Sequence, residues 1–245
     1  MNKLRSLTQI NKLLGPWQVV RFLTNRLRGH RSIDVRLPSS KSPIRIRFNN
    51  SDLVLLLGVF LHGDCHVSLS PHPACILDLG ANTGLTARAW SQQFPDAKII
   101  AVEPDEDTHA LCRTNTAAQP HTTCLKRIVS ASSGFGMLVD PSAISMARQF
   151  IESTEATANS IPMSTIDELL NEYTSKGPIL VKMDIEGAER SIFEQAGPWL
   201  GRVHGVIVEP HGVGTDELIR SVLGSRGFSV HQVGEKILGL RNPWR

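Results

Sequence analysis

Four side chains in the carboxyl-terminal half of the chain could transfer a proton or bind a divalent cation. Asp184 and Glu186 stand two positions apart in "VKMDIEGAE", and Glu209 and His211 stand two apart in "VEPHG". A carboxylate beside an imidazole can form a base together with the group that orients it. Asp184, Glu209 and His211 would also suit a divalent cation. The structural alternative is that Asp184 or Glu186 caps the helix that follows.

A second group of residues surrounds two glycines in "CILDLGANTG". Gly80 and Gly84 follow a short apolar run, and a glycine lets the backbone turn sharply and approach a ligand closely. A dinucleotide-binding loop reads G-x-G-x-x-G, but here Asn82 stands in place of the middle glycine. The loop therefore lacks room for a pyrophosphate. Asp78, just before the turn, would repel phosphate but could hold an ammonium group directly or through water.

Glu103 closes the next apolar run, where a carboxylate can accept hydrogen bonds from both hydroxyls of a ribose. A cofactor with a ribose, an ammonium group and no phosphate is S-adenosylmethionine. We infer that its site is formed by Asp78, Gly80, Asn82, Gly84 and Glu103, with Ser130 near the adenine. The structural alternative is that Asp78 binds backbone amides of the turn and Glu103 caps a helix.

These residues stand at the ends of apolar runs that alternate with helical stretches from Ala74 onward. The runs are "ACILDL", "AKIIAVE", "TCLKRIV", "PILVKMD" and "HGVIVE". This order predicts an α/β fold with a mostly parallel sheet and helices on both faces. Two last runs, in "GFSVHQVGEKILGLR", meet across Gly234 and Glu235 without room for a helix and must pair antiparallel. Ligands bind at the carboxyl ends of such parallel strands, so both groups of residues are expected at one edge.

The same motifs resemble those of a known family. "ILDLGANTG", "AVEPD" followed by "LCRTN", "STIDELL", "ILVKMDIEGAE" and "GVIVEPHG" are similar to successive motifs of the FkbM family of S-adenosylmethionine-dependent methyltransferases. The resemblance begins at about Ile33 and continues to the last residues. It implies a Rossmann-like class I methyltransferase fold, with seven strands, the last of them antiparallel. It also implies O-methylation, often of sugar or polyketide hydroxyls.

Methyl transfer is an in-line displacement, so positioning is the larger part of catalysis and removal of the acceptor's proton is the rest. We assign Asp184 to the methyl-acceptor site, with Glu186, Glu209 and His211 as further members. A divalent cation on Asp184, Glu209 and His211 is the alternative to a proton relay.

Two other functions stay open at this stage. A nicotinamide-dependent oxidoreductase could use a similar sheet, although the missing middle glycine of the loop argues against it. A non-catalytic adaptor could keep the fold and use a basic amino-terminal arm to bind a membrane or a partner.

We divide the chain into residues 1–73, which form a basic amphipathic arm, a β-hairpin and a cap helix, and a methyltransferase domain at 74–245. Seven of the 26 Lys and Arg residues fall within the first 31 positions, and no acidic residue does. Residues 1–30 either pack on their own domain with a solvated basic face or contact a membrane surface or partner. The long stretch 141–160, rich in Ser, Thr and Ala, is expected with the cap to shape the acceptor pocket.

Composition sets the remaining limits. With 245 residues, 41% of them hydrophobic, the chain can bury one sizeable core. The four cysteines form no metal-binding or disulfide pattern, and no apolar run approaches the length of a membrane span. The net charge is only +3. We expect a cytoplasmic enzyme with a small-molecule or glycan acceptor and no nucleic-acid partner.

Overall fold

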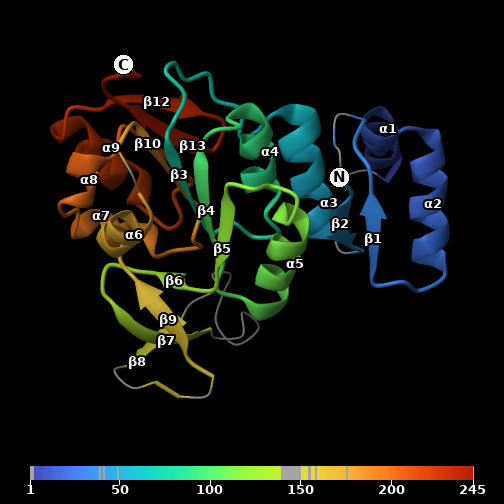
Figure 1. The fold of residues 1–245 in the computed structure, drawn as a ribbon, viewed down its shortest axis with the longest axis horizontal. Coiled ribbons are helices and arrows are strands. Elements are labelled where there is room, and N and C mark those ends of the chain that lie inside the picture. Colours follow the sequence, from blue (N-terminus) through green and yellow to red (C-terminus); the bar gives the residue numbers. More distant parts are fainter. Residues whose placement is uncertain are drawn as a thin grey trace.

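A seven-stranded sheet lies at the centre of the molecule, with helices on both faces (Figure 1). The computed structural model describes residues 3–38, 40, 42–48, 50–138, 150–153, 156–157, 159–174 and 176–244. Across the sheet the strand order is β12-β13-β11-β10-β3-β4-β5. The strands are β3 (Cys75–Leu79), β4 (Lys98–Val102), β5 (Thr122–Leu125), β10 (Ile179–Met183), β11 (Gly205–Val208), β12 (Ser229–Val233) and β13 (Lys236–Leu240).

The pairing of these strands confirms the predicted topology. β3, β4, β5, β10 and β11 run parallel, whereas β13 pairs antiparallel with both β11 and β12. Only Gly234 and Glu235 separate β12 from β13, which is too short for a crossover between parallel strands. The chain order reverses at β3, which has β4 on one side and β10 on the other. Ligands bind at such a reversal in open α/β sheets.

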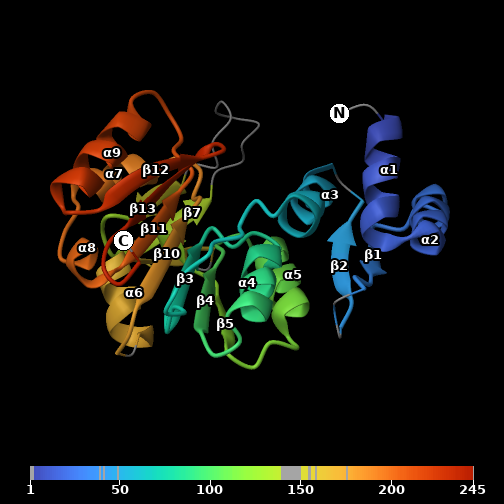
Figure 2. The ribbon, with the colours of Figure 1, turned by 90° about the horizontal axis from the view of Figure 1, so that it is seen from above.

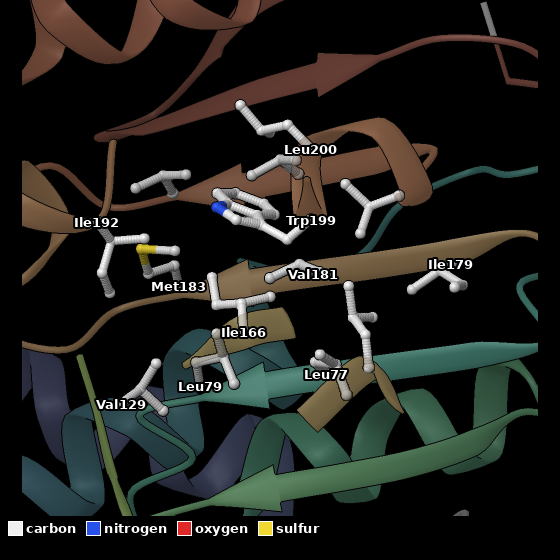
Figure 3. Packing of buried hydrophobic residues seen from close by; sticks show 14 of the residues in the cluster. Leu77, Leu79, Val129, Ile166, Ile179, Val181, Met183, Ile192, Trp199 and Leu200 are labelled. Carbon is white, nitrogen blue, oxygen red and sulfur yellow. The ribbon is translucent and has the colours of Figure 1, made fainter. Parts of the chain in front are cut away.

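Alternate residues of the central strands enter two apolar layers, as the period of a strand requires. Leu77 and Val181 pack in one layer with Trp199 (Figure 3). Leu180 packs in the other with Trp90. The first layer is covered by helices α6 (Ile166–Tyr173), α7 (Glu189–Glu194), α8 (Trp199–Arg202) and α9 (Thr215–Ser225), and the second by α4 (Leu85–Gln93) and α5 (Glu106–Thr116).

The amino-terminal elements form a cap at one end of the sheet (Figure 2). They are α1 (Lys3–Leu14), α2 (Pro16–Leu27), β1 (Ser32–Val35), β2 (Ile44–Arg47) and α3 (Asn50–Leu57), which continues as the π-helix η1 (Gly58–His62). β1 and β2 pair antiparallel as a hairpin. These elements share one apolar cluster, which also includes Leu85 of α4.

Two buried polar side chains join this cap to the rest of the molecule. Arg88 of α4 donates hydrogen bonds to the carbonyl oxygens of Pro43 and Asn115, at 2.9 and 2.8 Å. Asn115 of α5 accepts from the amide of Arg45 at 2.7 Å and donates to its carbonyl oxygen at 3.0 Å. The cap is therefore packed on α4 and α5, and a division of the chain at residue 73 stays a prediction.

A second sheet was not predicted from the sequence. It has the order β6-β9-β7-β8. Its strands are β6 (Ile128–Val129), β7 (Gly134–Leu138), β8 (Phe150–Ser153) and β9 (Ile161–Ser164). The expectation of one strand through "TCLKRIV" was wrong, because β5 ends at Leu125 and β6 pairs with β9 instead. Much of the predicted 141–160 stretch lies outside the described residues, and its 150–153 part is β8.

The four cysteines are free thiols, as expected. The Sγ atoms of Cys112 on α5 and Cys124 on β5 lie 3.3 Å apart. Among the described residues, no helix combines the length and the apolar character needed to cross a bilayer.

Candidate active site

Gly80 forms a turn where the ends of three strands meet. Its φ of +75° lies in the left-handed region that glycine adopts without a steric cost. A Cβ atom on Gly80 would lie 1.8 Å from the carbonyl oxygen of Asp184, so a larger residue would collide with the segment after β10. The amides of Gly80 and Ala81 donate to the carbonyl oxygen of Val102 on β4, at 3.0 and 2.9 Å. Glycine therefore permits the ends of β3, β4 and β10 to pack closely.

Gly84 serves the packing of two helices. It immediately precedes α4 and has a φ of +77°. A Cβ atom there would lie 2.8 Å from Sγ of Cys112 on α5. Gly84 lines neither of the two cavities described below. Its role in the structure is therefore to let α4 pack closely against α5.

Glu103 follows β4, and the glycine turn fixes its carboxylate. The amide of Asn82 donates to Oε2 and the amide of Asp105 donates to Oε1, each at 3.0 Å. Glu103 is only 5% exposed. Each carboxylate oxygen can accept more than one hydrogen bond, so these two amide hydrogen bonds alone do not saturate the carboxylate. Asn82 has a φ of 50°, a left-handed conformation that asparagine tolerates.

A cavity of about 270 Å³ opens at these strand ends. It brings together half of the predicted site residues, namely Gly80, Asn82, Glu103, Asp184 and Glu186. Its apolar lining includes residues of both sheets, among them Val102, Ile128, Val129, Leu138 and Phe150. Ser130 follows β6 but does not line the cavity, since it is buried and its amide donates to the carbonyl oxygen of Ser164 at 3.1 Å.

A smaller cavity of about 90 Å³ adjoins the first and shares Gly80, Asn82 and Asp184 with it. Leu55 of α3 and Val59 of η1 form part of its wall. The amino-terminal cap therefore closes one side of the candidate site.

Asp78 is completely buried and lies beside a buried cation. Nζ of Lys182, on the neighbouring strand β10, is 3.2 Å from Oδ1 of Asp78 and 3.6 Å from Oδ2 of Asp184. The same Nζ donates to the carbonyl oxygen of Gly80 at 2.8 Å. Burial alone would lower the pKa of Lys182, but the two carboxylates outweigh it and raise that pKa above its ordinary value. Lys182 is thus a charged residue that holds β3, the glycine turn and β10 together.

His211 is oriented by a carboxylate that the sequence analysis did not assign to the site. Nδ1 of His211 lies 3.0 Å from Oε1 of Glu189. The Glu189 side chain is completely buried and also accepts hydrogen bonds from the amides of Ile185 and Gly187, at 2.9 and 2.8 Å. The Glu189 hydrogen bond outweighs burial of the imidazole and raises the pKa of His211 to about 9.

The other ring nitrogen of His211, Nε2, lies near two more carboxylates. Nε2 of His211 is 4.0 Å from Oδ1 of Asp184 and 3.9 Å from Oε2 of Glu186. Ligand atoms of these three residues lie within 4.8 Å of one another. Glu209 is not part of this group, because it pairs instead with Lys236 of β13, at 3.3 Å. Of the predicted donor set, the structure therefore brings Asp184 and His211 together and adds Glu186 in place of Glu209.

Sequence reasoning gave Lys182, Glu189 and Lys236 no role in the site. Lys182 stands two positions before Asp184 and shares its strand face, but this spacing alone assigned it no partner. Glu189 opens α7, where a carboxylate is already expected from the helix dipole, so its position gave no further signal. The pairing of Lys236 with Glu209 depends on the register of β13 with β11, which the sequence does not state.

Two curated proteins are similar to part of this chain. A hexuronic acid methyltransferase of Haloferax volcanii is 32% identical over 136 residues, which cover 55% of this chain and 54% of the relative. A tRNA1(Val) (adenine(37)-N6)-methyltransferase of Vibrio parahaemolyticus is 36% identical over 110 residues, which cover 41% of this chain and 45% of the relative. The chain thus spans about half the length of the curated relatives it matches.

Solved structures of methyltransferases are also similar. An O-methyltransferase family protein from Burkholderia thailandensis has a TM-score of 0.46 at 10% identity, with 78% of this chain and 58% of that chain covered. A precorrin-6y C5,15-methyltransferase from Geobacter metallireducens has a TM-score of 0.43 at 11% identity, with coverage of 75% and 85%.

A family model carries the strongest comparison. The model of the methyltransferase FkbM domain matches residues 78–230. That range contains every predicted site residue, from Asp78 to His211, and more than half of the chain. The chain therefore belongs to the FkbM methyltransferase family, as its motifs predict.

Proposed function

We propose that this protein transfers the methyl group of S-adenosylmethionine to a hydroxyl group of a sugar, a glycan or a polyketide-type small molecule. One observation carries the proposal: the oriented carboxylate of Glu103 and the polar group of Asp184 and His211 lie at the same strand ends, on either side of Gly80. Family membership supports methyl transfer.

The larger cavity suits the nucleoside part of the methyl donor. Glu103 is oriented by two backbone amides, and we assign its carboxylate as the acceptor for the ribose hydroxyls. The apolar lining, with Ile128, Val129 and Phe150, suits a flat adenine ring. Asp78 already has Lys182 as a partner. Its carboxylate would therefore affect the donor only by stabilising the glycine turn together with Lys182, which also binds the Gly80 carbonyl oxygen.

His211 is our candidate for the base that removes the acceptor's proton. S-adenosylmethionine supplies the methyl group, and the proton of the acceptor hydroxyl passes to Nε2 of His211. Glu189 holds the other ring nitrogen and compensates the positive charge that results. Asp184 faces both cavities and lies 4.0 Å from Nε2, so it can accept a hydrogen bond from a neighbouring hydroxyl of the acceptor and so orient the reacting one toward His211.

A divalent cation is the rival explanation for the same side chains. Two carboxylates and an imidazole form a donor set that Mn²⁺ or Mg²⁺ can use, and a cation would polarise the acceptor oxygen. Assays with and without a chelator separate the explanations. Full activity in the chelator supports the relay through His211, whereas loss that added Mn²⁺ or Mg²⁺ restores would replace it with a cation on Asp184, Glu186 and His211.

The charges near the acceptor end favour a sugar over a nucleic acid. Asp184 and Glu186 lie there, and carboxylates repel the phosphates of a polyanion. The relative from Haloferax volcanii is a hexuronic acid methyltransferase, and its match is longer than that of the tRNA methyltransferase. We therefore place the acceptor among hydroxylated small molecules and glycans.

Calorimetry with S-adenosylmethionine tests the cofactor site. We expect the wild type to bind and Glu103→Ala to bind about tenfold or more weakly, because hydrogen bonds to a charged group contribute roughly 1.5–3 kcal/mol. Glu194→Ala is the matched control, since Glu194 is an exposed carboxylate on α7 that pairs with Arg190. Absence of binding by the wild type, or equal binding by Glu103→Ala, would contradict the assignment.

A transfer assay with methyl-labelled S-adenosylmethionine tests the acceptor class. The panel contains glycans with hexuronic acids, neutral glycans and tRNA. We expect label in a glycan as a methyl ether, which survives mild alkali, whereas a methyl ester would be released. Label found only in tRNA, or only in an alkali-labile product, would overturn the proposed O-methylation of a hydroxyl.

A further inference from the structure

Helix α2 exposes a row of apolar side chains to solvent. Trp17 is 85% exposed, Val20 54%, Leu23 38% and Leu27 87%. Their spacings of three, three and four residues place them on one face of the helix. These four make up nearly half of the nine large hydrophobic side chains that are exposed in the described part of the chain.

The opposite face of α2 is anchored to the cap. Phe22 is 3% exposed, and its ring lies 5.0 Å from that of Phe48, between centroids. Gln18 accepts a hydrogen bond from the amide of Arg36 at 2.7 Å. The helix is thus held in place from within, and the exposed row is not needed to cover the cluster beneath it.

Arginines flank the apolar row. Arg21 and Arg28 are seven positions apart and lie along one side of it, and Arg26 lies on the other side. All three are exposed, and within the described residues none forms an ion pair with a carboxylate. The first acidic residue of the sequence is Asp34. The surface is therefore both apolar and positively charged.

We propose that α2 docks this protein on an anionic lipid surface. Trp17 and the leucines would enter the boundary between headgroups and acyl chains, where tryptophan is favoured, while the arginines bind lipid phosphates. The helix has 12 residues and would lie in the surface plane. This docking does not depend on the proposed methyl transfer.

A second copy of the chain suits this face less well. In a two-fold symmetric dimer the same patch meets itself, so Arg21 and Arg28 of one copy would approach those of the other. Residues 1–33 contain no carboxylate, and Asp34, whose charge acts on Arg21, already pairs with Arg45. Anionic phospholipids supply both the apolar layer and the negative charge that the patch lacks.

The position of α2 leaves the site open while the protein is docked. In both views α2 lies at the end of the molecule farthest from α8 and α9 (Figures 1 and 2). The other elements of the cap lie between α2 and the seven-stranded sheet (Figure 2). Docking through α2 thus buries no residue that we place in the active site.

Tryptophan fluorescence of the full chain tests the proposal. Trp17 is 85% exposed, whereas Trp90, Trp199 and Trp244 are 1%, 3% and 8% exposed, so a shift in emission reports Trp17. We expect a blue shift and co-sedimentation with vesicles of phosphatidylcholine and phosphatidylglycerol. Phosphatidylcholine alone should give little of either, and added salt should weaken the binding.

Variants identify the residues responsible. Arg21→Glu with Arg28→Glu should lower vesicle affinity about tenfold or more, because each basic residue contributes about 1 kcal/mol. Trp17→Ser with Leu27→Ser should abolish co-sedimentation, and Val233→Ser, on the exposed side of β12, should leave it unchanged. The wild type failing to bind anionic vesicles would overturn the proposal. A dimer in ultracentrifugation that Trp17→Ser with Leu27→Ser abolishes would instead make the face a self-interface.

Discussion

The imidazole of His211 has a different neighbour at each of its nitrogens. Glu189 holds Nδ1, and Asp184 and Glu186 face Nε2. All three acidic groups favour the protonated ring, so the pKa of His211 is raised to about 9. A stronger base than free imidazole is better matched to an alcohol, but a smaller fraction of it is deprotonated at neutral pH.

This balance predicts a pH profile. Because only deprotonated His211 accepts a proton, kcat/KM should rise with pH up to about 9 in the wild type. Glu189→Gln removes the largest cause of the raised pKa, so the rising limb should move to lower pH, toward the ordinary histidine value. Rates of methyl transfer across a pH series measure this shift.

The control for that profile is Glu194→Gln, also on α7, whose carboxylate faces Arg190 rather than the imidazole. The rising limb of the kcat/KM profile of Glu194→Gln should coincide with that of the wild type. The rising limb of the pH profile could also stay in place in Glu189→Gln while circular dichroism shows an intact fold. That result would exclude His211 as the titrating base.

At the scale of elements, the site depends on how closely the ends of β3 and β10 approach. The hydrogen of Gly80 faces the carbonyl oxygen of Asp184, and Lys182 binds the Gly80 carbonyl from the side of β10. The glycine turn and Asp184 therefore share one wall of the candidate site. A change in the backbone of either segment displaces the other.

Gly80→Ala tests this contact. The new methyl group would collide with Asp184, and alanine would also be strained at a φ of +75°. We expect the free energy of unfolding to fall by about 2 kcal/mol or more and S-adenosylmethionine affinity to fall about tenfold or more.

Gly234→Ala is the matched control for Gly80→Ala. Gly234 has a φ of +60° but has no atom within 4 Å of its added Cβ, so it carries only the conformational cost of about 1 kcal/mol. Urea unfolding and calorimetry compare the two variants. Equal losses in both would show that the contact with Asp184 has no effect of its own.

Elements with a strong local pattern were predicted, and elements without one were not. The central strands β3 and β10 are five-residue segments buried on both faces and apolar except for Asp78 and Lys182, so their order along the chain predicts a parallel sheet. β6 has only two residues, Ile128–Val129, and its partner β9 lies beyond the 141–160 stretch. Such a short strand has no period of its own, so the second sheet depends on contacts that sequence alone does not give.

The residues of the candidate site also fall into a predicted group and an unpredicted group. The glycine turn and Glu103 were predicted because a strand end fixes where they lie. Partners such as Glu189 for His211, and Lys236 for Glu209, come from side chains brought together by the folded sheet. Residue type and spacing find the groups that can react, whereas the groups that orient them are found only in three dimensions.

For the whole molecule, one buried arginine joins the cap to the core. Arg88 is 1% exposed and donates to carbonyl oxygens of the cap and of α5. Arg88→Met would leave these oxygens without a donor, at a cost of about 1–3 kcal/mol each. We expect urea unfolding to show a loss of about 3 kcal/mol or more, and limited proteolysis to cleave first within the cap.

Arg220→Met provides the comparison, because Arg220 lies on the exposed surface of α9, where it bonds Gln232. It should change the free energy of unfolding by less than about 0.5 kcal/mol. If Arg88→Met is no less stable than Arg220→Met, the cap does not depend on this arginine.

The bond from Lys182 to Gly80 also has a consequence for how the protein folds. It joins residues 102 positions apart, and closing so long a loop is slow because its entropy is lost before any contact compensates it. The glycine turn and Glu103 depend only on β3 and β4 and can form early. The candidate site stays incomplete until β10 pairs with β3, because Lys182 and Asp184 come from β10 and the segment after it. In a refolding time course, the capacity to bind the methyl donor should therefore arise with the last cooperative step, so that a partly folded chain does not capture the donor.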